Sequence, residues 1–425
     1  MEDKLRNNLL KLPSVHLVSV IESLIAEFGE EAAAIAAEKL RTLKQCWIVK
    51  LTPDTFSAIS SQWLNLSEFC RLDSAFCHRN LRLQFKQCVQ QNCIVFAQPT
   101  ASNLKMELFV RWIISRQIRL DRLNLHYREI DAELLILYLK ASGDSLRSID
   151  FAGANYLNEE CVGTIIKYCP TLEVLSCWYC NHIAVEFVVS IFSHCTALRE
   201  LDLSYATANV LGGLWSDFEG TCIKTTALRK LYLTDQRHLC DVHFCPIVST
   251  CTSLAELSLI NCTNLTRVSF DAVATNLLQL TSLHTCSTSI HDTALIQIVQ
   301  NCTNLECLLL NDCVGVTQLS LTAILNHSHH LTHLSLNHNP HVADIFLENI
   351  HASFPKLTKF HIDGCHTVTP TGVLCVVKNC ALLSVFSVKE FHPGFDDAVR
   401  QGIIAGKHWL GAWKDRKLSL YLSTV

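Results

Sequence analysis

The sequence predicts an α/β solenoid, a horseshoe-like arc of about eleven strand–helix repeats of 26 residues that follows an α-helical N-terminal module. Three observations predict this fold. A LxxLxL pattern recurs at near-constant spacing, each run alternates apolar with polar residues, and apolar residues at helical spacing follow each run. A single strand–helix unit cannot bury its apolar side, whereas stacked units share one continuous core.

The pattern starts at eleven leucines that divide most of the chain into near-equal units. Nine of the ten spacings between them are 25 or 26 residues, and the fourth unit alone has 30. The fourth position of the pattern is Leu, Ile or Phe throughout, and the sixth is apolar except at Thr285. The first leucines are Leu120, Leu146, Leu172, Leu198, Leu228, Leu254, Leu280, Leu305, Leu331, Leu357 and Leu383.

Each LxxLxL run has the period of a strand, and the residues after it have the period of a helix. In the unit that starts at Leu305, the predicted apolar helix positions are Val316, Leu319, Leu321, Ile324 and Leu325. The strands are expected on the inner face of the arc and the helices on its outer face. Side chains that alternate with the leucines point away from the core, so Leu308 is expected to be buried and Ser335 to be exposed.

Cysteines stand at two fixed places in the repeat. The chain has 22 of them, and no convincing signal peptide opens it, so we expect a cytoplasmic or nuclear protein with reduced thiols. Both places fall at turns between strand and helix, where a small apolar side chain fits inward. We therefore predict buried, unliganded cysteines and no metal or other cofactor. Those three residues before a first leucine are Cys169, Cys195, Cys251, Cys302 and Cys380, and those eight after one are Cys180, Cys262, Cys313 and Cys365.

This arrangement resembles the cysteine-containing subtype of leucine-rich repeats, which has a 26-residue unit with cysteine before the first leucine and after LxxLxL. The resemblance covers residues 116–390. It implies a protein-binding solenoid. Residues 391–425 are predicted to form a C-terminal cap, because Leu418, Leu420 and Leu422 alternate like a final strand and Trp409 and Trp413 can cover the last core layer.

The first 115 residues do not repeat, and we predict a helical module there. Within it, residues 51–85 resemble an F-box, whose pattern is Leu-Pro, a helix with an apolar seam, Leu-x-Leu-x-x-Leu, then Val-Cys-x-x-Trp. Pro53 takes the place of the proline. Leu64, Leu66 and Phe69 take the place of the middle run, and Phe76-Cys77 that of the Val-Cys.

The same stretch departs from the F-box pattern at two points. Thr52 separates Leu51 from Pro53, and no tryptophan lies near position 80. An F-box would make the chain a substrate receptor of a cullin–RING (SCF-type) ubiquitin ligase, with the adaptor bound at Pro53, Phe56, Leu66 and Phe69. The alternative is a leucine-rich-repeat scaffold without a ligase role, whose N-terminal helices only cap the solenoid.

Aromatic and acidic residues meet at the early strands of the predicted inner face. We predict a target-binding patch there, since exposed aromatic clusters are typical interface anchors and the acids suit a partner with basic residues. The alternative is that Tyr179 and Tyr205 fold back over the turn as packing. The predicted patch consists of Trp178, Tyr179, Tyr205 and Tyr232 with Asp150 and Asp202.

Other functions find little support in the sequence. Net charge is −4, so no basic field favours nucleic acid or a membrane surface, and no run reaches the roughly 18 apolar residues of a membrane helix. Cys177 and Cys180 form a CxxC, but both are repeat positions. His333, His361 and Asp363 can converge on the inner face, where we favour a solvated polar surface over a metal site. We find no catalytic motif and expect no enzyme.

Overall fold

The computed structural model describes residues 106–116, 119–184, 186–208, 213–389, 395–405 and 419–422. The F-box-like stretch 51–85, with Pro53, Phe56, Leu66 and Phe69, lies outside these residues. The chain divides into two compact units, residues 1–174 and 175–425. Each unit is described by itself below.

The first unit contains two parallel strands, a helix before them and a helix after each of them. Strands β1 and β2 pair in register, with Leu123 opposite Ile149. Both side chains are buried. The described elements are α7 (Met106–Arg116), β1 (Arg122–Asn124), α8 (Ala132–Ser142), the 3-10 helix η2 (Gly143–Ser145), β2 (Ser148–Asp150) and α9 (Glu159–Tyr168), and β3 (Val174–Ser176) begins where the unit ends.

The second unit continues the same alternation. Its strands follow one another in chain order in a parallel sheet, and each helix connects two neighbouring strands. The strands are β4 (Glu200–Asp202), β5 (Lys230–Tyr232), β6 (Glu256–Ser258), β7 (Ser282–His284), β8 (Cys307–Leu309), β9 (His333–Ser335), β10 (Lys359–His361), β11 (Val385–Val388) and β12 (Ser419–Leu422). The α-helices are α10 (Glu186–His194), α11 (Asp241–Thr250), α12 (Arg267–Asn276), α13 (Asp292–Asn301), α14 (Gln318–His327), α15 (Asp344–Ser353), α16 (Pro370–Asn379) and α17 (Phe395–Ala405).

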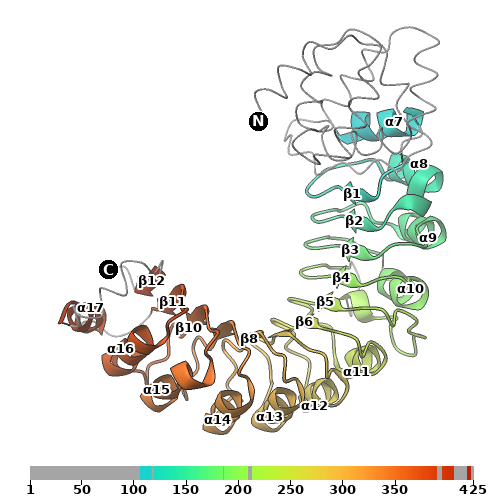
Figure 1. Cartoon of the computed structure of the whole chain (residues 1–425). Coiled ribbons are helices and arrows are strands. Elements are labelled where there is room, and N and C mark those ends of the chain that lie inside the picture. Colours follow the sequence, from blue (N-terminus) through green and yellow to red (C-terminus); the bar gives the residue numbers. More distant parts are fainter. Residues whose placement is uncertain are drawn as a thin grey trace, which may run out of the picture. The chain divides into compact units, whose positions relative to one another are not determined.

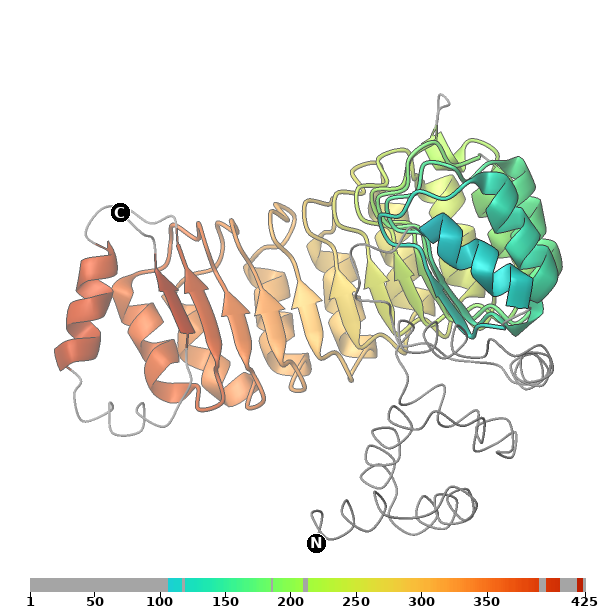
Figure 2. The same cartoon turned by 90° about the horizontal axis from the view of Figure 1, so that it is seen from above.

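The predicted repeat register is confirmed. Each strand from β1 to β11 begins two residues after one of the eleven first leucines, and the fourth ladder residue lies in the middle of the strand with its side chain in the core. In the second unit the strands follow the inner side of an arc and helices α11 to α16 lie on its outer side (Figure 1). Seen from above, strands β6 to β11 lie side by side (Figure 2).

A final strand forms near the C-terminus. Strand β12 pairs in parallel with β11 and places Leu420 opposite Phe386, as the alternation of leucines predicts. Trp409 and Trp413 lie outside the described residues, so their part in a cap remains a prediction.

The expectation of one α-helix per repeat is wrong for the described part of the unit that starts at Leu198. A short 3-10 helix, Gly213–Trp215, stands there instead. The Trp215 ring lies 5.3 Å from that of Phe218, which in turn lies 5.4 Å from Phe192, all in edge-to-face geometry. These three rings pack against one another beside the 3-10 helix of the longer repeat.

The turn cysteines are buried, and several of them form hydrogen bonds through their thiols. The Sγ atoms of Cys251 and Cys302 each donate to a backbone carbonyl of the preceding repeat at 3.2 Å. Cys262 and Cys313 do the same at 3.0 Å from the other turn. The predicted packing role is therefore confirmed, and the thiols also link one repeat to the next.

Burial makes these thiols chemically inert. It raises the pKa of Cys251 and Cys262 to about 12, and that of Cys302 and Cys313 to about 11. Because the thiolate is the nucleophile and the metal-binding form, such groups are poor ligands and react slowly at neutral pH. The described cysteines form no disulfides.

The prediction that Ser335 is exposed is wrong. Its side chain is buried, and its Oγ donates to Asn311 Oδ1 at 2.6 Å. The same Asn311 oxygen accepts from the backbone N–H of Asn337 at 2.9 Å, and Asn337 Oδ1 accepts from the Asp363 N–H at 2.8 Å. The side-chain oxygens of Asn311 and Asn337 thus each accept a hydrogen bond from the next repeat just beyond the strand ends, and the Asn311 side chain binds the serine hydroxyl.

One predicted helix position also differs. Leu319 is 67% exposed, although its spacing suggested a core residue. Its neighbour Ser320 is buried instead, and its hydroxyl donates to Asp292 of the preceding repeat. Asp292 Oδ2 also accepts from Thr317 Oγ1 at 2.6 Å. This polar link between helix N-termini turns α14 so that Leu319 faces outward.

Candidate functional site

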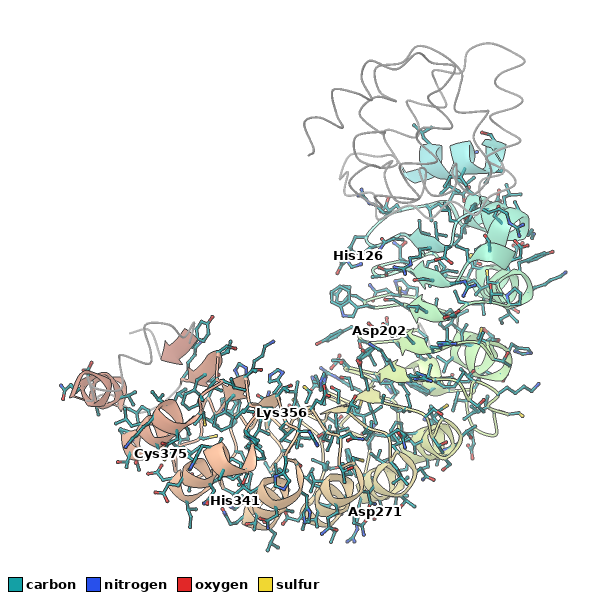
Figure 3. The ribbon with its side chains drawn as sticks, in the orientation of Figure 1. His126, Asp202, Asp271, His341, Lys356 and Cys375 are labelled. Atoms are coloured by element: carbon teal, nitrogen blue, oxygen red, sulfur yellow. The ribbon has the colours of Figure 1, made fainter. Side chains whose placement is uncertain are left out.

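The inner face of the second unit displays the predicted patch residues at the ends of neighbouring strands. Trp178 and Tyr179 follow β3, Asp202 ends β4, Tyr205 follows β4, and Tyr232 ends β5. Figure 3 shows Asp202 on the strand side of the unit and Asp271 on the helix side. The repeat geometry therefore brings these side chains to one surface.

Three of the aromatic rings contact one another. The ring centroids of Trp178 and Tyr179 are 5.8 Å apart, those of Tyr179 and Tyr205 are 6.3 Å apart, and those of Trp178 and Tyr205 are 6.4 Å apart. Tyr179 is 49% exposed, Tyr205 is 40% exposed, and Trp178 is half-buried. We call these three residues the aromatic cluster. The exposure of both tyrosines favours the surface interpretation over packing.

The two tyrosines have a strained backbone. Tyr179 has φ 55° and Tyr205 has φ 57°, the left-handed region that bulky side chains rarely adopt. The equivalent turn position of every later repeat up to α16 also has positive φ, but it carries small or polar residues that tolerate this conformation better. Those residues are Asp235, Asn261, Ser287, Asp312, His338 and Gly364.

Strain of this kind is concentrated at functional sites. A left-handed tyrosine costs on the order of 1–2 kcal/mol relative to glycine. Positive φ at this position is a property of the repeat turn, since Tyr127 in the first unit has φ 50° as well.

Acidic groups lie beside the aromatic cluster. The Asp202 carbonyl accepts a hydrogen bond at 2.7 Å from the N–H of Cys177, the residue before Trp178. Its carboxylate accepts from the Ser204 N–H at 2.9 Å. Glu200 lies on the same strand, two residues earlier, and faces the same side.

Tyr232 differs from the other aromatic residues of the patch. It is half-buried, and its hydroxyl donates to Glu256, whose carboxylate also pairs with Lys230 at 2.9 Å. Burial raises the pKa of Tyr232, and the Glu256 hydrogen bond and the charges of Glu256, Glu200 and Asp202 raise it further. Tyr232 therefore belongs to an acidic group on β4 to β6, and no ring contact joins it to the aromatic cluster among the described residues.

Asp150 lies in the first unit, at the end of β2. Its Oδ2 accepts from Asn124 Nδ2 at 3.0 Å and lies 3.5 Å from His126 Nδ1. Its other carboxylate oxygen accepts from the Ala152 N–H at 2.9 Å. Its contribution to a target site remains a prediction.

Farther along the second unit, ligand-type side chains form a row across β7 to β10. Cys307 Sγ lies 3.5 Å from His284 Nε2 and 3.6 Å from His333 Nδ1, and the rings of His333 and His361 are 5.4 Å apart. Burial lowers the pKa of all three histidines, that of His333 to about 4, so the imidazoles are neutral near pH 7. Within the described ranges, no three His, Cys, Asp or Glu side chains could hold a metal ion.

The arrangement as a whole suits recognition of another protein. Solenoids of this kind offer an extended concave surface for binding, and here that surface carries an exposed aromatic cluster next to acids. Sequence reasoning found these residues but missed the left-handed turn position, whose signal is the Asp, Asn, Ser or Gly at the same place in later repeats. None of the described helices is long and apolar enough to cross a membrane.

Comparisons with known proteins agree on the repeats. Residues 222–364 match the model of the family described as "FBD-associated F-box protein At5g56370, LRR repeats". The Arabidopsis thaliana protein "BTB/POZ domain-containing protein FBL11" is 24% identical over 243 residues, which cover 53% of this chain and 25% of that protein. The chain thus spans about a quarter of the length of this curated relative.

Two solved structures match this chain at low similarity. Rad7, from a yeast complex of Rad7 and Elc1, has 13% identity and a TM-score of 0.46, and the match covers 78% of this chain and 96% of that one. An internalin (inlF) from Listeria monocytogenes has 14% identity and a TM-score of 0.37, and the match covers 76% of this chain and 95% of the internalin chain.

The fold and the repeat pattern make this chain a leucine-rich-repeat protein, a class that typically mediates protein–protein interaction. The family match further confirms the predicted resemblance to F-box/LRR proteins, through repeats like theirs at residues 222–364.

A tyrosine substitution tests whether the aromatic cluster serves stability. Tyr205→Asn relieves about 1–2 kcal/mol of backbone strain and loses ring contacts worth about 0.5–1.5 kcal/mol. We therefore expect a free energy of unfolding within about 1 kcal/mol of wild type, measured by urea denaturation. Tyr138→Asn is the matched control: Tyr138 is fully buried, and its loss is expected to cost about 3 kcal/mol or more. A similar loss for Tyr205→Asn would make that tyrosine a packing residue.

Proposed function

We propose that this protein is the substrate receptor of a cullin–RING (SCF-type) ubiquitin ligase. In this proposal the inner face of the repeats binds a target protein through Trp178, Tyr179, Tyr205, Tyr232, Asp150 and Asp202. The N-terminal module binds the ligase adaptor through Pro53, Phe56, Leu66 and Phe69, and the adaptor links the receptor to the cullin. The match of residues 222–364 to the repeats of F-box proteins carries the proposal.

The chemistry of the chain supports a location in the cytoplasm or nucleus. Its described cysteines are free thiols, and many are buried as packing residues. Such thiol-rich interiors suit a reducing compartment, where disulfides are rare.

A scaffold without a ligase role is the second candidate. The departures of residues 51–85 from the F-box pattern, Thr52 before Pro53 and no tryptophan near position 80, favour it. In that case the N-terminal helices cap the solenoid, and the inner face binds its partner for another purpose.

Adaptor binding separates the two candidates. We expect the full-length chain to co-purify with the adaptor that F-box modules bind, and Leu66→Asp to weaken this binding at least tenfold, because a charge in a helix-in-groove contact removes an apolar anchor. Val314→Asp is the control, since Val314 is 80% exposed on the repeats. Deletion of residues 1–90 should also abolish co-purification.

Folding of each variant is checked by circular dichroism and by hydrogen exchange of the repeat amides. If the folded full-length chain does not bind the adaptor at micromolar concentration, the ligase proposal fails and the scaffold remains. Equal loss with Leu66→Asp and Val314→Asp would also contradict the proposed adaptor site.

A further inference from the structure

The aromatic cluster and the acids beside it define the chemistry of a partner. Trp178, Tyr179 and Tyr205 present three rings at mutual centroid distances of 5.8 to 6.4 Å, and no two of them are stacked in parallel, since the interplanar angles are 41°, 52° and 88°. Rings at this spacing touch one another. They offer ring faces and edges at the surface.

The cluster is held in place by the sheet. The Tyr179 N–H donates to the Ser204 carbonyl at 2.9 Å, and the Tyr205 N–H donates to the Thr234 carbonyl at 2.8 Å. Both tyrosines therefore have a fixed backbone despite their unfavourable φ angles. A preorganised surface of this kind loses little conformational entropy on binding.

The neighbouring charge is negative. Burial raises the pKa of Tyr232 most, and the hydrogen bond to Glu256 and the charges of Glu256, Glu200 and Asp202 raise it further. Lys230 already pairs with Glu256 at 2.9 Å. This side of the cluster therefore attracts a cation more than an anion.

Aromatic faces and carboxylates share one preferred ligand. A guanidinium or ammonium group is attracted by the ring quadrupole when it lies within about 6 Å of the centroid, and the same group pairs with a carboxylate. An apolar anchor would gain nothing from Asp202, and an anionic one would be repelled by it.

We propose that the aromatic cluster binds a cationic side chain, arginine or lysine, of the protein that docks on the inner face, with Asp202 as its counter-charge. This inference rests on the proposed role of that face in target binding. It adds the chemical class of the residue that the target must supply. It also gives the strained tyrosines a purpose, because smaller turn residues would present no ring to the cation.

Selection from a random peptide library tests the inference. Phage-displayed 12-residue peptides are selected on the full-length protein, and those that lose binding to Trp178→Ala are synthesised. We expect each to contain an arginine or lysine whose replacement by neutral citrulline or norleucine weakens binding about tenfold, measured by fluorescence anisotropy.

Three variants locate the cation. Tyr205→Asn should weaken the same peptides, since it removes a ring and restores a favourable turn residue. Asp202→Asn should weaken them while its side-chain oxygen keeps the hydrogen bond from the Ser204 N–H. Val314→Ala, at an exposed position outside the inner-face strands, should leave affinity unchanged. Added salt should weaken wild-type binding more than binding to Asp202→Asn.

Peptides that require Trp178 but bind equally well with citrulline or norleucine would overturn the inference. So would a selection that yields no peptide dependent on Trp178 or Tyr205. Adaptor binding does not involve these residues, so either result would leave the ligase proposal standing. If the protein does not bind the adaptor, the peptide experiment still decides whether the cluster binds a cation.

Discussion

Replacing Leu308 with alanine is expected to lower the free energy of unfolding by about 2–5 kcal/mol. Leu308 is fully buried in the middle of β8, with Leu283 opposite it on β7 and Leu334 opposite it on β9. Truncation removes apolar contacts and leaves a cavity between three repeats, which the rigid strand ladder cannot close.

Leu319→Ala is the matched control for this prediction. It is the same chemical change in the same repeat, but Leu319 is 67% exposed, so the expected cost is within about 0.5 kcal/mol. Both variants are measured by urea denaturation followed by circular dichroism. Long repeat arrays can depart from two-state behaviour, so hydrogen exchange of the β8 amides supplies a local free energy. Equal effects of the two substitutions would mean that the register is wrong.

Ser335 cannot serve as the neutral control that its place in the repeat suggests. It is buried and donates to Asn311, so Ser335→Ala removes a hydrogen bond and leaves the Asn311 oxygen one partner short. We expect a cost of about 0.5–1.5 kcal/mol, between those of Leu319→Ala and Leu308→Ala.

The fold was predictable because one physical rule repeats eleven times. A strand with alternating apolar residues must bury one side, and the constant spacing fixes which residues do so. Every first leucine is buried in the structure, and the turn cysteines follow from the same register. The predicted burial was wrong where a side chain forms a hydrogen bond to another repeat, because the periodicity within one repeat carries no information about contacts with the next.

Leu319 and Ser335 illustrate this limit. Asp292 of one repeat draws Ser320 of the next inward and so exposes Leu319, while Asn311 covers Ser335. One signal of the Ser335 contact in the sequence is the recurrence of Asn or Asp at the sixth residue after three successive first leucines. Those residues are Asn311, Asn337 and Asp363.

The candidate site was predictable in part for a related reason. Alternation along the strands places Asp202 and Tyr232 on the inner face, and Figure 3 shows Asp202 on the strand side of the unit. The pairing of Tyr232 with Glu256 and the contact of Tyr179 with the other rings depend on side-chain rotamers and on the turn. Composition and spacing do not determine these.

The largest effect of a polar substitution is expected at Gln236. This residue occupies the turn position that cysteine takes in other repeats, yet its side chain makes three buried hydrogen bonds. Its Nε2 donates to the carbonyls of Leu203 at 2.8 Å and Ala206 at 2.9 Å, and its Oε1 accepts from Trp215 Nε1 at 2.9 Å. Gln236 follows β5, so these bonds join the 3-10 helix to the turns after β4 and β5.

Gln236→Ala would leave the Trp215 N–H and the Ala206 carbonyl without these buried partners, while the Leu203 carbonyl keeps the hydrogen bond from the Ala206 N–H at 3.1 Å. Because each buried unpaired group costs about 1–3 kcal/mol, we expect a loss of about 3 kcal/mol or more in the free energy of unfolding. Trp215→Phe is the graded control, since it removes only the N–H donor and keeps most of the ring packing against Phe218. We expect it to cost about 1–3 kcal/mol, because it also leaves one acceptor oxygen of Gln236 unpaired.

The double variant decides whether these two residues act together. If the Trp215–Gln236 hydrogen bond holds the 3-10 segment, the losses of unfolding free energy in the two single variants should add up to more than the loss in the double variant. The difference, which is the coupling energy, should be about 0.5–3 kcal/mol. Hydrogen exchange should rise first around Gly213–Trp215, next to the turn after β4 that carries Tyr205. Additive costs, or a loss below about 1 kcal/mol for Gln236→Ala, would show that the long repeat is held by its aromatic packing alone.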